Sequence, residues 1–478
     1  MRYLYIVVFT VLLISPGCKQ KTEITEEIQS KELIQTISHL ASPELNGRLA
    51  GSKGYNEAAE FVASKFSEYG LKDLGFDNYY QNLKLEYNSI EECSFSKIIS
   101  KDSAREYELG EDYVCRGFSG SGDIKAPVVF CGYGISDQNV NYNDYKNVDV
   151  DGKIVMQFKA DPNWKINQKN IGYNSLRKKA LLARQNGAIG IIFVSRPNQK
   201  NPQKPIGSVM HGKGKQLVNF PQIHVDLKTA NDFFEHSSIT LSELQKKIDE
   251  EKQPQSVNLH TQAHIFVKAL YEPKKASMNV AGMIPAQNKN ADEYIVLGAH
   301  LDHVGEQAGE IYFPGANDNA SGVASLLEVA EAFSVNKPKN RSIIFVAFTA
   351  EESGLVGARY FVENSPVELN KIHAMLNMDC VGHGDSVVVG GGKSAPALYD
   401  IVRKKDSLMK NMVINRTWHG GGADATPFYE KGVSTLYFAT KNSYTHLHLL
   451  SDKPNTINKE LHQYITRLIY RTASEMAQ

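Results

Sequence analysis

The sequence predicts an α/β fold in which a mostly parallel, mixed sheet is covered by helices. In the C-terminal block, 266–478, short apolar runs typical of buried strands alternate with amphipathic helical segments. Acidic and imidazole side chains follow directly after several of these runs. An earlier block, 118–265, has strand and helix patterns of its own but no cluster of possible metal ligands. These three observations predict a catalytic α/β domain with a smaller α/β insert.

Length and charge limit the possible functions. The chain has 478 residues, enough for two domains, and 42% of them are hydrophobic, as expected for a chain with a real core. Lysine plus arginine equals aspartate plus glutamate, 53 against 53. No bulk electrostatic field therefore recruits nucleic acid or an acidic partner.

The first 18 residues, MRYLYIVVFTVLLISPGC, are typical of an export signal. Arg2 provides a short basic region, and the apolar run from Leu4 to Ile14 is shorter than a membrane span. The segment resembles a bacterial lipoprotein signal, with Cys18 as the lipidated first residue of the mature chain, although Pro16 departs from the usual pattern. We therefore expect an exported lipoprotein of the periplasm or outer membrane/cell surface, tethered by 19–30. An ordinary cleaved signal or an uncleaved anchor is the alternative.

Four cysteines remain after Cys18, and their spacing matches no CxxC metal pattern. They are Cys93, Cys115, Cys131 and Cys380. An exported protein can form disulfides, and Cys93 could pair with Cys115. Free buried thiols are an equal alternative, so the sequence leaves the pairing open.

The region 31–117 is predicted to form the N-terminal part of the catalytic domain. Residues 31–72 show helical spacing, interrupted by the turn-rich loop SPELNGRLAGSKG, and the second helix should stop at Gly70. Residues 76–115 alternate like strands. In 118–265, APVVFCGYG and GKIVMQF read as strands, followed by a helix, a glycine stop and a buried strand. This block resembles a protease-associated domain. The alternative is that its strands extend the main sheet.

The catalytic block places polar residues after apolar strands. YIVLGA precedes His300, SIIFVAFT precedes Glu351 and Glu352, and IHAMLNM precedes Asp379. STLYFA lies ahead of His448. The carboxyl ends of parallel strands meet at one edge of a sheet, where ligands and catalytic groups gather. We therefore expect these side chains to converge there.

Each motif has a chemical and a structural interpretation. His300 could bind metal through one ring nitrogen while Asp302 holds the other, or both could form a core ion pair. Asp318, in ANDNASG before a helix, could bridge two cations or cap the helix. The neighbouring Glu351 and Glu352 repel each other unless positive charge is close. The conjunction of such motifs in one block favours a two-metal hydrolase.

The chain resembles the co-catalytic di-zinc exopeptidases, which include bacterial leucine aminopeptidases, glutamate carboxypeptidase II and the transferrin receptor. The resemblance covers nearly everything after the tether. It implies an α/β/α sandwich with a mostly parallel mixed sheet and an inserted protease-associated domain. It also implies five metal ligands, with Asp318 shared between the ions. These are His300, Asp318, Glu352, Asp379 and His448.

The resemblance further implies two Zn²⁺ per chain, with Glu351 as general base and Asp302 as the partner of His300. Imidazole and carboxylate ligands suit zinc independently, with Co²⁺ or Mn²⁺ as possible substitutes. Two such ions would hold a water between them, lower its pKa and polarise the scissile carbonyl. Glu351 would pass the water proton to the leaving amine.

One position departs from the family pattern. Related enzymes often carry a tyrosine directly before the last histidine, where it steadies the oxyanion, and here Leu447 stands there. Tyr444 is a nearby candidate for the same task. The loop HGGGADATPF, with Asp424 and Phe428, resembles the segment near the family's substrate pocket. His419 in this loop is interpreted as loop or pocket lining, not as a sixth ligand.

The leading hypothesis is an aminopeptidase that removes N-terminal residues from peptides. A carboxypeptidase of the glutamate-releasing type is the alternative, and it would need arginines gripping a free carboxylate; the sequence does not place Arg359 or Arg416. Glutaminyl cyclisation is disfavoured because all five ligands are intact. A non-catalytic receptor-like protein should show gaps among the ligands, and the sequence shows none. Side-chain specificity and oligomeric state stay open.

Overall fold

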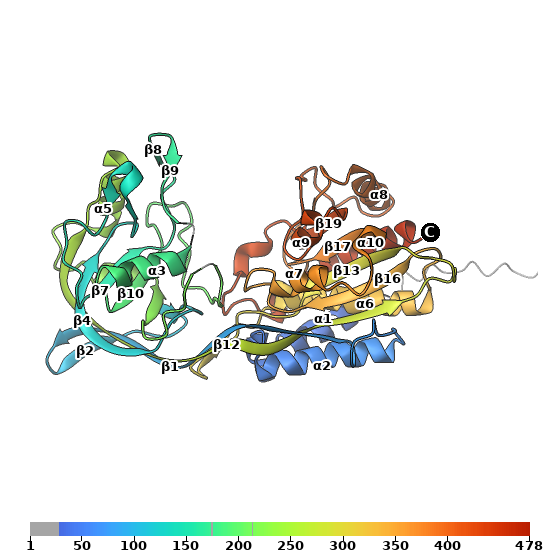
Figure 1. The fold of residues 1–478 in the computed structure, drawn as a ribbon, viewed down its shortest axis with the longest axis horizontal. Coiled ribbons are helices and arrows are strands. Elements are labelled where there is room, and N and C mark those ends of the chain that lie inside the picture. Colours follow the sequence, from blue (N-terminus) through green and yellow to red (C-terminus); the bar gives the residue numbers. More distant parts are fainter. Residues whose placement is uncertain (1–27, 174, 213) are drawn as a thin grey trace, which may run out of the picture.

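The computed structural model describes residues 28–173, 175–212 and 214–478. The predicted signal peptide and most of the predicted tether lie outside these residues. Two lobes are visible, joined by two long strands that run from one lobe into the other (Figure 1). These strands are β1 (Tyr80–Ser100) and β12 (Val257–Ile284), and they pair antiparallel along most of their length.

The larger lobe contains the predicted parallel sheet. Its order is β18 (Val387–Gly390), β19 (Thr435–Thr440), β17 (Ile372–Met378), β13 (Tyr294–His300), β16 (Ser342–Phe348) and β12. The four central strands are mutually parallel, and the two outer strands are antiparallel to their neighbours. β13 and β16 are buried along almost their whole length, as expected for a sheet covered on both faces.

Helices cover both faces of this sheet, which makes the predicted three-layer sandwich. One hydrophobic core joins the sheet to the helices α1 (Ser30–Leu40), α2 (Lys53–Glu68), α6 (Ser321–Val335), α8 (Pro396–Ser407) and α10 (Lys459–Met476). A separate core on the opposite face holds α7 (Val356–Glu363) and α9 (Ala425–Glu430). The helical regions predicted before residue 72 are confirmed, although α2 ends two residues before Gly70, which has a positive φ of 69°.

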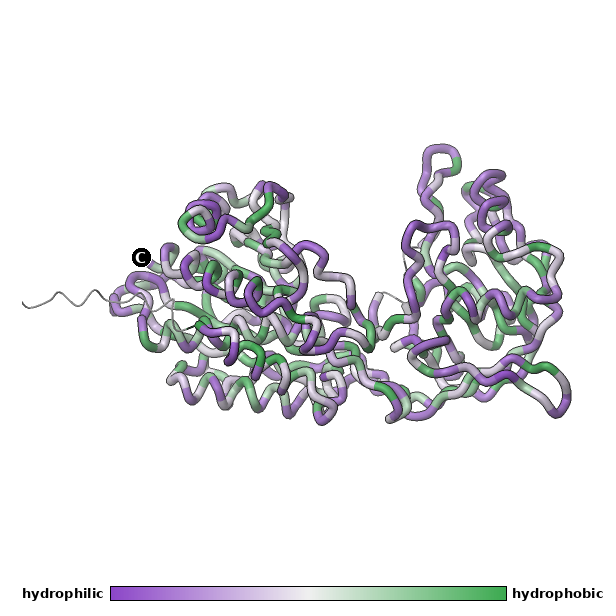
Figure 2. Tube along the Cα trace, turned by 180° about the vertical axis from the view of Figure 1, so that it is seen from behind, coloured by the Kyte–Doolittle hydropathy of each residue, from purple (hydrophilic) through white to green (hydrophobic). Residues whose placement is uncertain are grey.

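The smaller lobe is built on parallel strands flanked by helices. β4 (Gly122–Phe130), β7 (Ile154–Phe158), β10 (Gly190–Val194) and β11 (Gln222–Val225) are parallel, and β3 (Tyr113–Cys115) closes the edge. Its helices are α3 (Leu176–Gln185), α4 (Leu227–Asp232) and α5 (Leu241–Glu251). Figure 2 shows apolar residues along the inner segments of both lobes.

The sequence of block 118–265 allows either an inserted domain or an extension of the main sheet, and the structure shows features of both. The lobe has hydrophobic cores distinct from those of the larger lobe, as an insert should. Its sheet is nevertheless continuous with the main sheet, because β12 pairs with β16 at one end and with β4 at the other. The four described cysteines carry free thiols. Among the described residues, no helix combines the length and the apolar character that a membrane span requires.

Candidate metal centre

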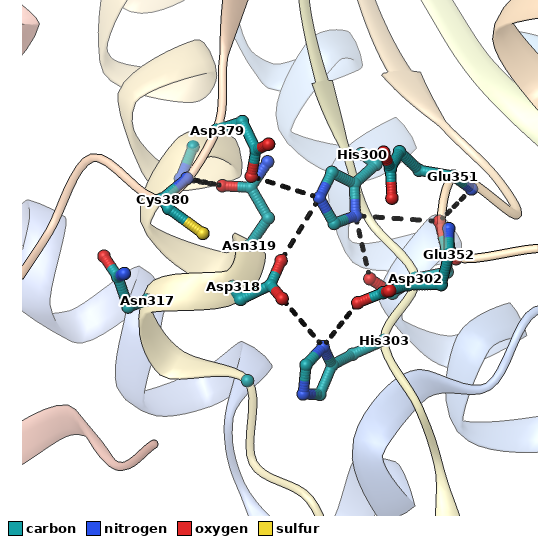
Figure 3. Close-up of polar contacts among 12 residues, drawn as sticks. His300, Asp302, His303, Asn317, Asp318, Asn319, Glu351, Glu352, Asp379 and Cys380 are labelled. Atoms are coloured by element: carbon teal, nitrogen blue, oxygen red, sulfur yellow. Dashed lines mark hydrogen bonds and ion pairs between the residues drawn. The ribbon is translucent and has the colours of Figure 1, made fainter. Parts of the chain in front are cut away.

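The predicted residues converge at the carboxyl edge of the main sheet. His300 is the last residue of β13, Asp379 follows β17 directly, and Glu351 and Glu352 follow β16 after two intervening residues. Asp318 lies in the short helical segment η4 (Ala316–Ala320), in front of α6, and its peptide bond to Asn319 is cis. The sheet therefore brings together side chains from three separate connections, as Figure 3 shows.

The first group of potential metal ligands joins three buried side chains. Nε2 of His300 lies 3.3 Å from Oδ1 of Asp318 and 3.4 Å from Oδ1 of Asp379. The ligand atoms of these residues are all within 4.8 Å of one another. A single ion could contact one imidazole and two carboxylates at this point.

The second group uses the other oxygen of Asp318. Nε2 of His448, from the loop after η6 (Ser443–His446), lies 2.9 Å from Oε2 of Glu352 and 3.2 Å from Oδ2 of Asp318. His303 completes this group: its Nδ1 is 3.1 Å from Oε1 of Glu352 and 3.8 Å from Oδ2 of Asp318. All five predicted ligands thus belong to one of two groups that share Asp318, and His303 is an additional member that the sequence interpretation missed.

The residues present fit a pair of divalent cations. Burial raises the pKa of Asp302 to about 7, and burial also raises the pKa of Asp452 to about 7. The pKa of Asp424 is raised well above its usual value, mainly by burial. So many buried acids destabilise one another unless positive charge is close. Two sets of mixed imidazole and carboxylate donors are the ligand chemistry that zinc prefers, and they supply the place for that charge.

Glu351 lies beside the ligands without belonging to either group. Burial raises the pKa of its carboxyl group well above the usual value, and the negative charge of Glu352 adds to the rise, while His300 opposes it. A carboxyl group with a raised pKa holds a proton more readily than an ordinary glutamate. Its place beside both ligand groups and its raised proton affinity make Glu351 the candidate general base.

Asp302 acts mainly on the glutamates. Its carboxylate accepts hydrogen bonds from the backbone N–H groups of Glu351 (3.0 Å) and Glu352 (3.3 Å). Nδ1 of His300 is 3.1 Å from the backbone oxygen of Asp302 but 3.8 Å from its Oδ1. The residue predicted as the partner of His300 thus holds that ring through its carbonyl, and its carboxylate fixes the loop that carries both glutamates.

Two further side chains fix the loop around Asp318. The Asp452 carboxylate accepts hydrogen bonds from the backbone N–H groups of Asn317 (2.9 Å) and Asp318 (3.0 Å). Oδ1 of Asn319 accepts from the N–H of Cys380 at 3.3 Å, which ties this loop to the one that carries Asp379. Such supporting contacts set the orientation of metal ligands.

Arg48 joins the early loop of the chain to the centre. Its side chain is completely buried and donates hydrogen bonds to the backbone oxygens of Leu301 (3.0 Å), Pro314 (2.9 Å) and Gly315 (3.0 Å). It donates a further hydrogen bond to the carbonyl of Leu40. Arg48 therefore holds the segments that follow His300 and precede Asp318, so the ELNGRLAGSKG loop supports the metal centre.

Two tyrosines lie next to Asp379. The hydroxyl of Tyr437, on β19, donates a hydrogen bond to Oδ2 of Asp379 at 2.9 Å. Tyr444 is 61% exposed and lies in η6, which follows β19. Partial burial and the charge of Asp379 raise the pKa of Tyr444 to about 12, so its hydroxyl stays protonated. An exposed hydroxyl donor therefore stands beside the centre, although Leu447 occupies the position where relatives often have tyrosine.

The HGGGADATPF loop is divided between the site and the core. Asp424 is fully buried, and neither of its carboxylate oxygens has a hydrogen-bond partner among the described residues. Phe428 packs against Phe348 in the hydrophobic core below α7 and α9. His419 is exposed and belongs to neither ligand group, as expected for a loop residue.

Comparison with known proteins identifies both lobes. Residues 279–473 match the model of peptidase family M28, and residues 124–233 match the PA domain. The larger lobe therefore carries a peptidase family M28 domain. The M28 match covers the strands and loops that carry all the potential metal ligands, and the PA match covers most of the smaller lobe.

The curated relatives have low sequence identity to this chain, but the alignments cover most of it. The chain is 25% identical to a glutamate carboxypeptidase 2 homolog of Caenorhabditis briggsae, over 90% of this chain and 66% of that protein. It is also 25% identical to an aminopeptidase of Pseudomonas aeruginosa, over 77% of this chain and 59% of that protein. The chain thus spans about three-fifths to two-thirds of the length of these relatives.

Solved structures confirm the M28 fold. An aminopeptidase from Aneurinibacillus sp. strain AM-1 superposes with a TM-score of 0.65 at 21% identity, covering 95% of both chains. A peptidase M28 precursor from Shewanella amazonensis SB2B gives a TM-score of 0.67 at 20% identity, again covering 95% of both chains. At this identity the likeness establishes the architecture of the two lobes.

Proposed function

We propose that this protein is a zinc-dependent aminopeptidase that holds two zinc ions per chain and removes N-terminal residues from peptides. The observation that carries the proposal is the division of the Asp318 carboxylate: Oδ1 lies beside His300 and Oδ2 beside His448. One carboxylate that faces two ligand groups in this way would serve as a ligand for both ions.

The two ions would be held by different residues. His300, Asp318 and Asp379 would hold one, and Asp318, Glu352 and His448 would hold the other. His303 lies close enough to this second group to add a fourth side chain. When bound, the ions would polarise the scissile carbonyl and lower the pKa of the attacking water. Co²⁺ or Mn²⁺ could substitute for Zn²⁺.

The chain's own residues would handle the protons. Glu351 would accept the proton of the attacking water and return it to the leaving amine. The carboxylate of Asp302 would keep Glu351 in place, because it binds the backbone N–H of that residue and of Glu352. Tyr444 would donate a hydrogen bond from its hydroxyl to the developing oxyanion, in place of the tyrosine missing at Leu447.

The aminopeptidase from Pseudomonas aeruginosa and the one from Aneurinibacillus support cleavage at the amino end. The carboxypeptidase alternative is supported by the Caenorhabditis homologs, which are named for glutamate release. Peptides blocked at the N-terminus or at the C-terminus distinguish the two. An aminopeptidase cleaves only those with a free amine, whereas a carboxypeptidase cleaves only those with a free carboxylate.

Metal dependence is the first test of the proposal. Removal of metal by a chelator should abolish hydrolysis of an aminoacyl anilide, and added zinc or cobalt should restore it. Full activity after verified metal removal would refute the mechanism.

We further propose that the protein is an exported lipoprotein anchored through Cys18. The short apolar run 4–14 and the small residue Gly17 before Cys18 support this. Cys18→Ser should prevent lipidation, detected by incorporation of a labelled fatty acid, and should move the protein from the membrane fraction to the soluble fraction. A membrane-bound, unlabelled wild-type protein would contradict it.

A further inference from the structure

The smaller lobe contains a large cavity that the metal chemistry does not use. Its volume is about 1120 Å³, slightly above the usual range for small-molecule sites. Its wall is formed by residues that directly follow β3, β7 and β10, by the start of α3, and by the segment 208–212. Its wall includes polar groups of the kind that orient a ligand.

The charge of this cavity is unbalanced. Among the residues that line it, three are arginine or lysine and one is aspartate: Arg116, Lys159, Arg196 and Asp161. Asp161 forms an ion pair with Lys179 at 2.8 Å, so its charge is already compensated. The N-terminal end of α3 also faces the cavity, through Ser175 and Leu176, and a helix N-terminus favours negative charge.

Of the three cations, Arg116 gives the strongest indication of a bound anion. Only 5% of it is exposed, and its buried Nε has no hydrogen-bond partner. Nη1 reaches the backbone oxygen of Ile206 at 3.4 Å, and the guanidinium lies over the ring of Phe118. No carboxylate of the described residues lies within ion-pair distance of Arg116. A buried guanidinium with an unused donor needs an anion, since an unpaired buried charge is costly.

The other two cations also lack a carboxylate partner among the described residues. Lys159 is half-buried and donates to the neutral amide oxygen of Gln203. Arg196 donates from Nη1 to the backbone oxygen of Asp161 at 3.1 Å. Neutral acceptors satisfy hydrogen bonds but leave the positive charges uncompensated. A carboxylate group bound among these three side chains would compensate their positive charge.

The wall of this cavity touches the catalytic centre. The N–H of Gly207 donates to the backbone oxygen of His448 at 2.9 Å. The next residue, Ser208, lines the cavity and accepts a hydrogen bond from the N–H of Gly117. His211, also on the wall, lies close to Gly354, in the loop that carries the glutamates: a methyl group on Gly354 would be 3.7 Å from its Nδ1.

We infer that this cavity binds a carboxylate of the peptide substrate, with Arg116 as its main contact and Lys159 and Arg196 in support. The inference rests on the proposed peptidase function and adds a substrate class to it. The substrates would be short peptides whose α-carboxylate reaches the cavity, or peptides in which an acidic side chain reaches it. An extended peptide advances about 3.3–3.6 Å per residue, so one peptide length should suit the separation between metals and cavity best.

The test compares matched peptides in buffers free of phosphate and sulfate. Peptides of two to five residues are made with a C-terminal acid or amide, and amide-ended peptides are made with Glu or Gln at each position after the first. We expect kcat/KM to favour one acidic series by about tenfold or more, with an optimum length, because a hydrogen-bonded charge pair is being formed. Preference for the acid end identifies the α-carboxylate, and preference for Glu identifies a side chain.

Variants locate the effect in the cavity. Arg116→Gln should bring the acidic preference close to one, because kcat/KM for the acidic peptides should fall toward that for their neutral counterparts. Lys159→Gln changes a half-buried residue and should reduce the preference for acidic peptides. It replaces Arg116→Gln in the test if that variant does not fold. Lys178→Gln changes an exposed cation outside the cavity lining and should keep the preference. Equal cleavage of acidic and neutral peptides, or a preference that survives both cavity substitutions, would overturn the inference.

A binding measurement separates this inference from the proposed function. N-acetylated peptides have no free amine, so their binding to the metal-free protein can be followed by calorimetry without cleavage. The acid form should bind more tightly than the amide, and Arg116→Gln should remove the difference. If the acid form binds more tightly but no peptide is hydrolysed, the carboxylate site is supported and the proposed peptidase function is refuted. If peptides are hydrolysed but the acid form shows neither tighter binding nor faster cleavage, the peptidase function is supported and the carboxylate site is refuted.

Discussion

Nδ1 of His303 lies 3.1 Å from Oε1 of Glu352, and this contact brings a sixth side chain to a centre for which the sequence predicted five ligands. His303 is fully buried, and its other ring nitrogen, Nε2, has no hydrogen-bond partner among the described residues. A buried imidazole that meets two potential ligands contributes to metal binding, either by contacting the ion or by holding Glu352 in place.

His303→Ala is therefore expected to weaken zinc binding at the group formed by Asp318, Glu352 and His448. Removal of a contact that orients a ligand typically costs about 10–100-fold in metal affinity. Competition against a coloured chelator measures the affinity of each ion separately. His373→Ala, which removes an exposed histidine from β17, is the matched control and should bind zinc normally. Unchanged affinity in His303→Ala would remove His303 from the centre.

Glu351→Gln should keep both zinc ions but lose about 10²–10⁴-fold in kcat. The reason is that Glu351 belongs to neither ligand group, yet it has the raised pKa of a proton acceptor. Steady-state kinetics gives the rate, and elemental analysis of the same sample gives the metal content. Glu363→Gln changes an exposed glutamate at the end of α7 and should behave as wild type. An active Glu351→Gln enzyme would refute the assigned role.

Tyr444→Phe tests the source of the oxyanion donor. Loss of one such donor typically lowers kcat by about 10²–10³-fold, and KM should change little because the contact forms mainly in the transition state. Tyr429→Phe, which removes the hydroxyl of another exposed tyrosine, should leave kcat unchanged. If Tyr444→Phe keeps the wild-type kcat, another group performs this task.

Glu328 should make the folded protein less stable at alkaline pH. Burial in α6 raises its pKa to about 8, and Glu331 and Glu32 add to the rise. A raised carboxyl pKa means that the folded state favours the protonated form, so stability is greatest below the ordinary pKa of about 4.5 and falls until the pH passes about 8. Glu328→Gln should abolish this part of the fall and stabilise the protein by a few kcal/mol at pH ~9. Urea unfolding from pH 5 to 9 measures it; parallel curves for wild type and variant would contradict it.

The sequence predicted the parts of the site that depend on local order along the chain. A strand followed by a histidine or acid is visible as a pattern, and parallel pairing brings those strand ends together, so His300, Glu352 and Asp379 were identifiable. His303 carried a weak signal, as the second histidine of HLDH, but the sequence does not show which way a loop histidine turns.

Contacts between distant segments were not predictable in the same way. Arg48 meets the carbonyl of Leu301 across 253 residues, and only the folded chain shows this contact. Tyr437 reaches Asp379 because β17 and β19 are paired in one register, with Met378 opposite Phe438. The cations of the smaller lobe likewise come from strands and loops whose separation along the chain conceals their common cavity.

The central claim is that Asp318 joins two metal sites, and the zinc content of the purified protein tests it most directly. Native mass spectrometry of the zinc-loaded chain should show two zinc ions per folded molecule. Asp318→Asn should fall below two, while the control variant His373→Ala keeps both. A fully folded, zinc-saturated wild-type protein that holds one ion or none would contradict the account.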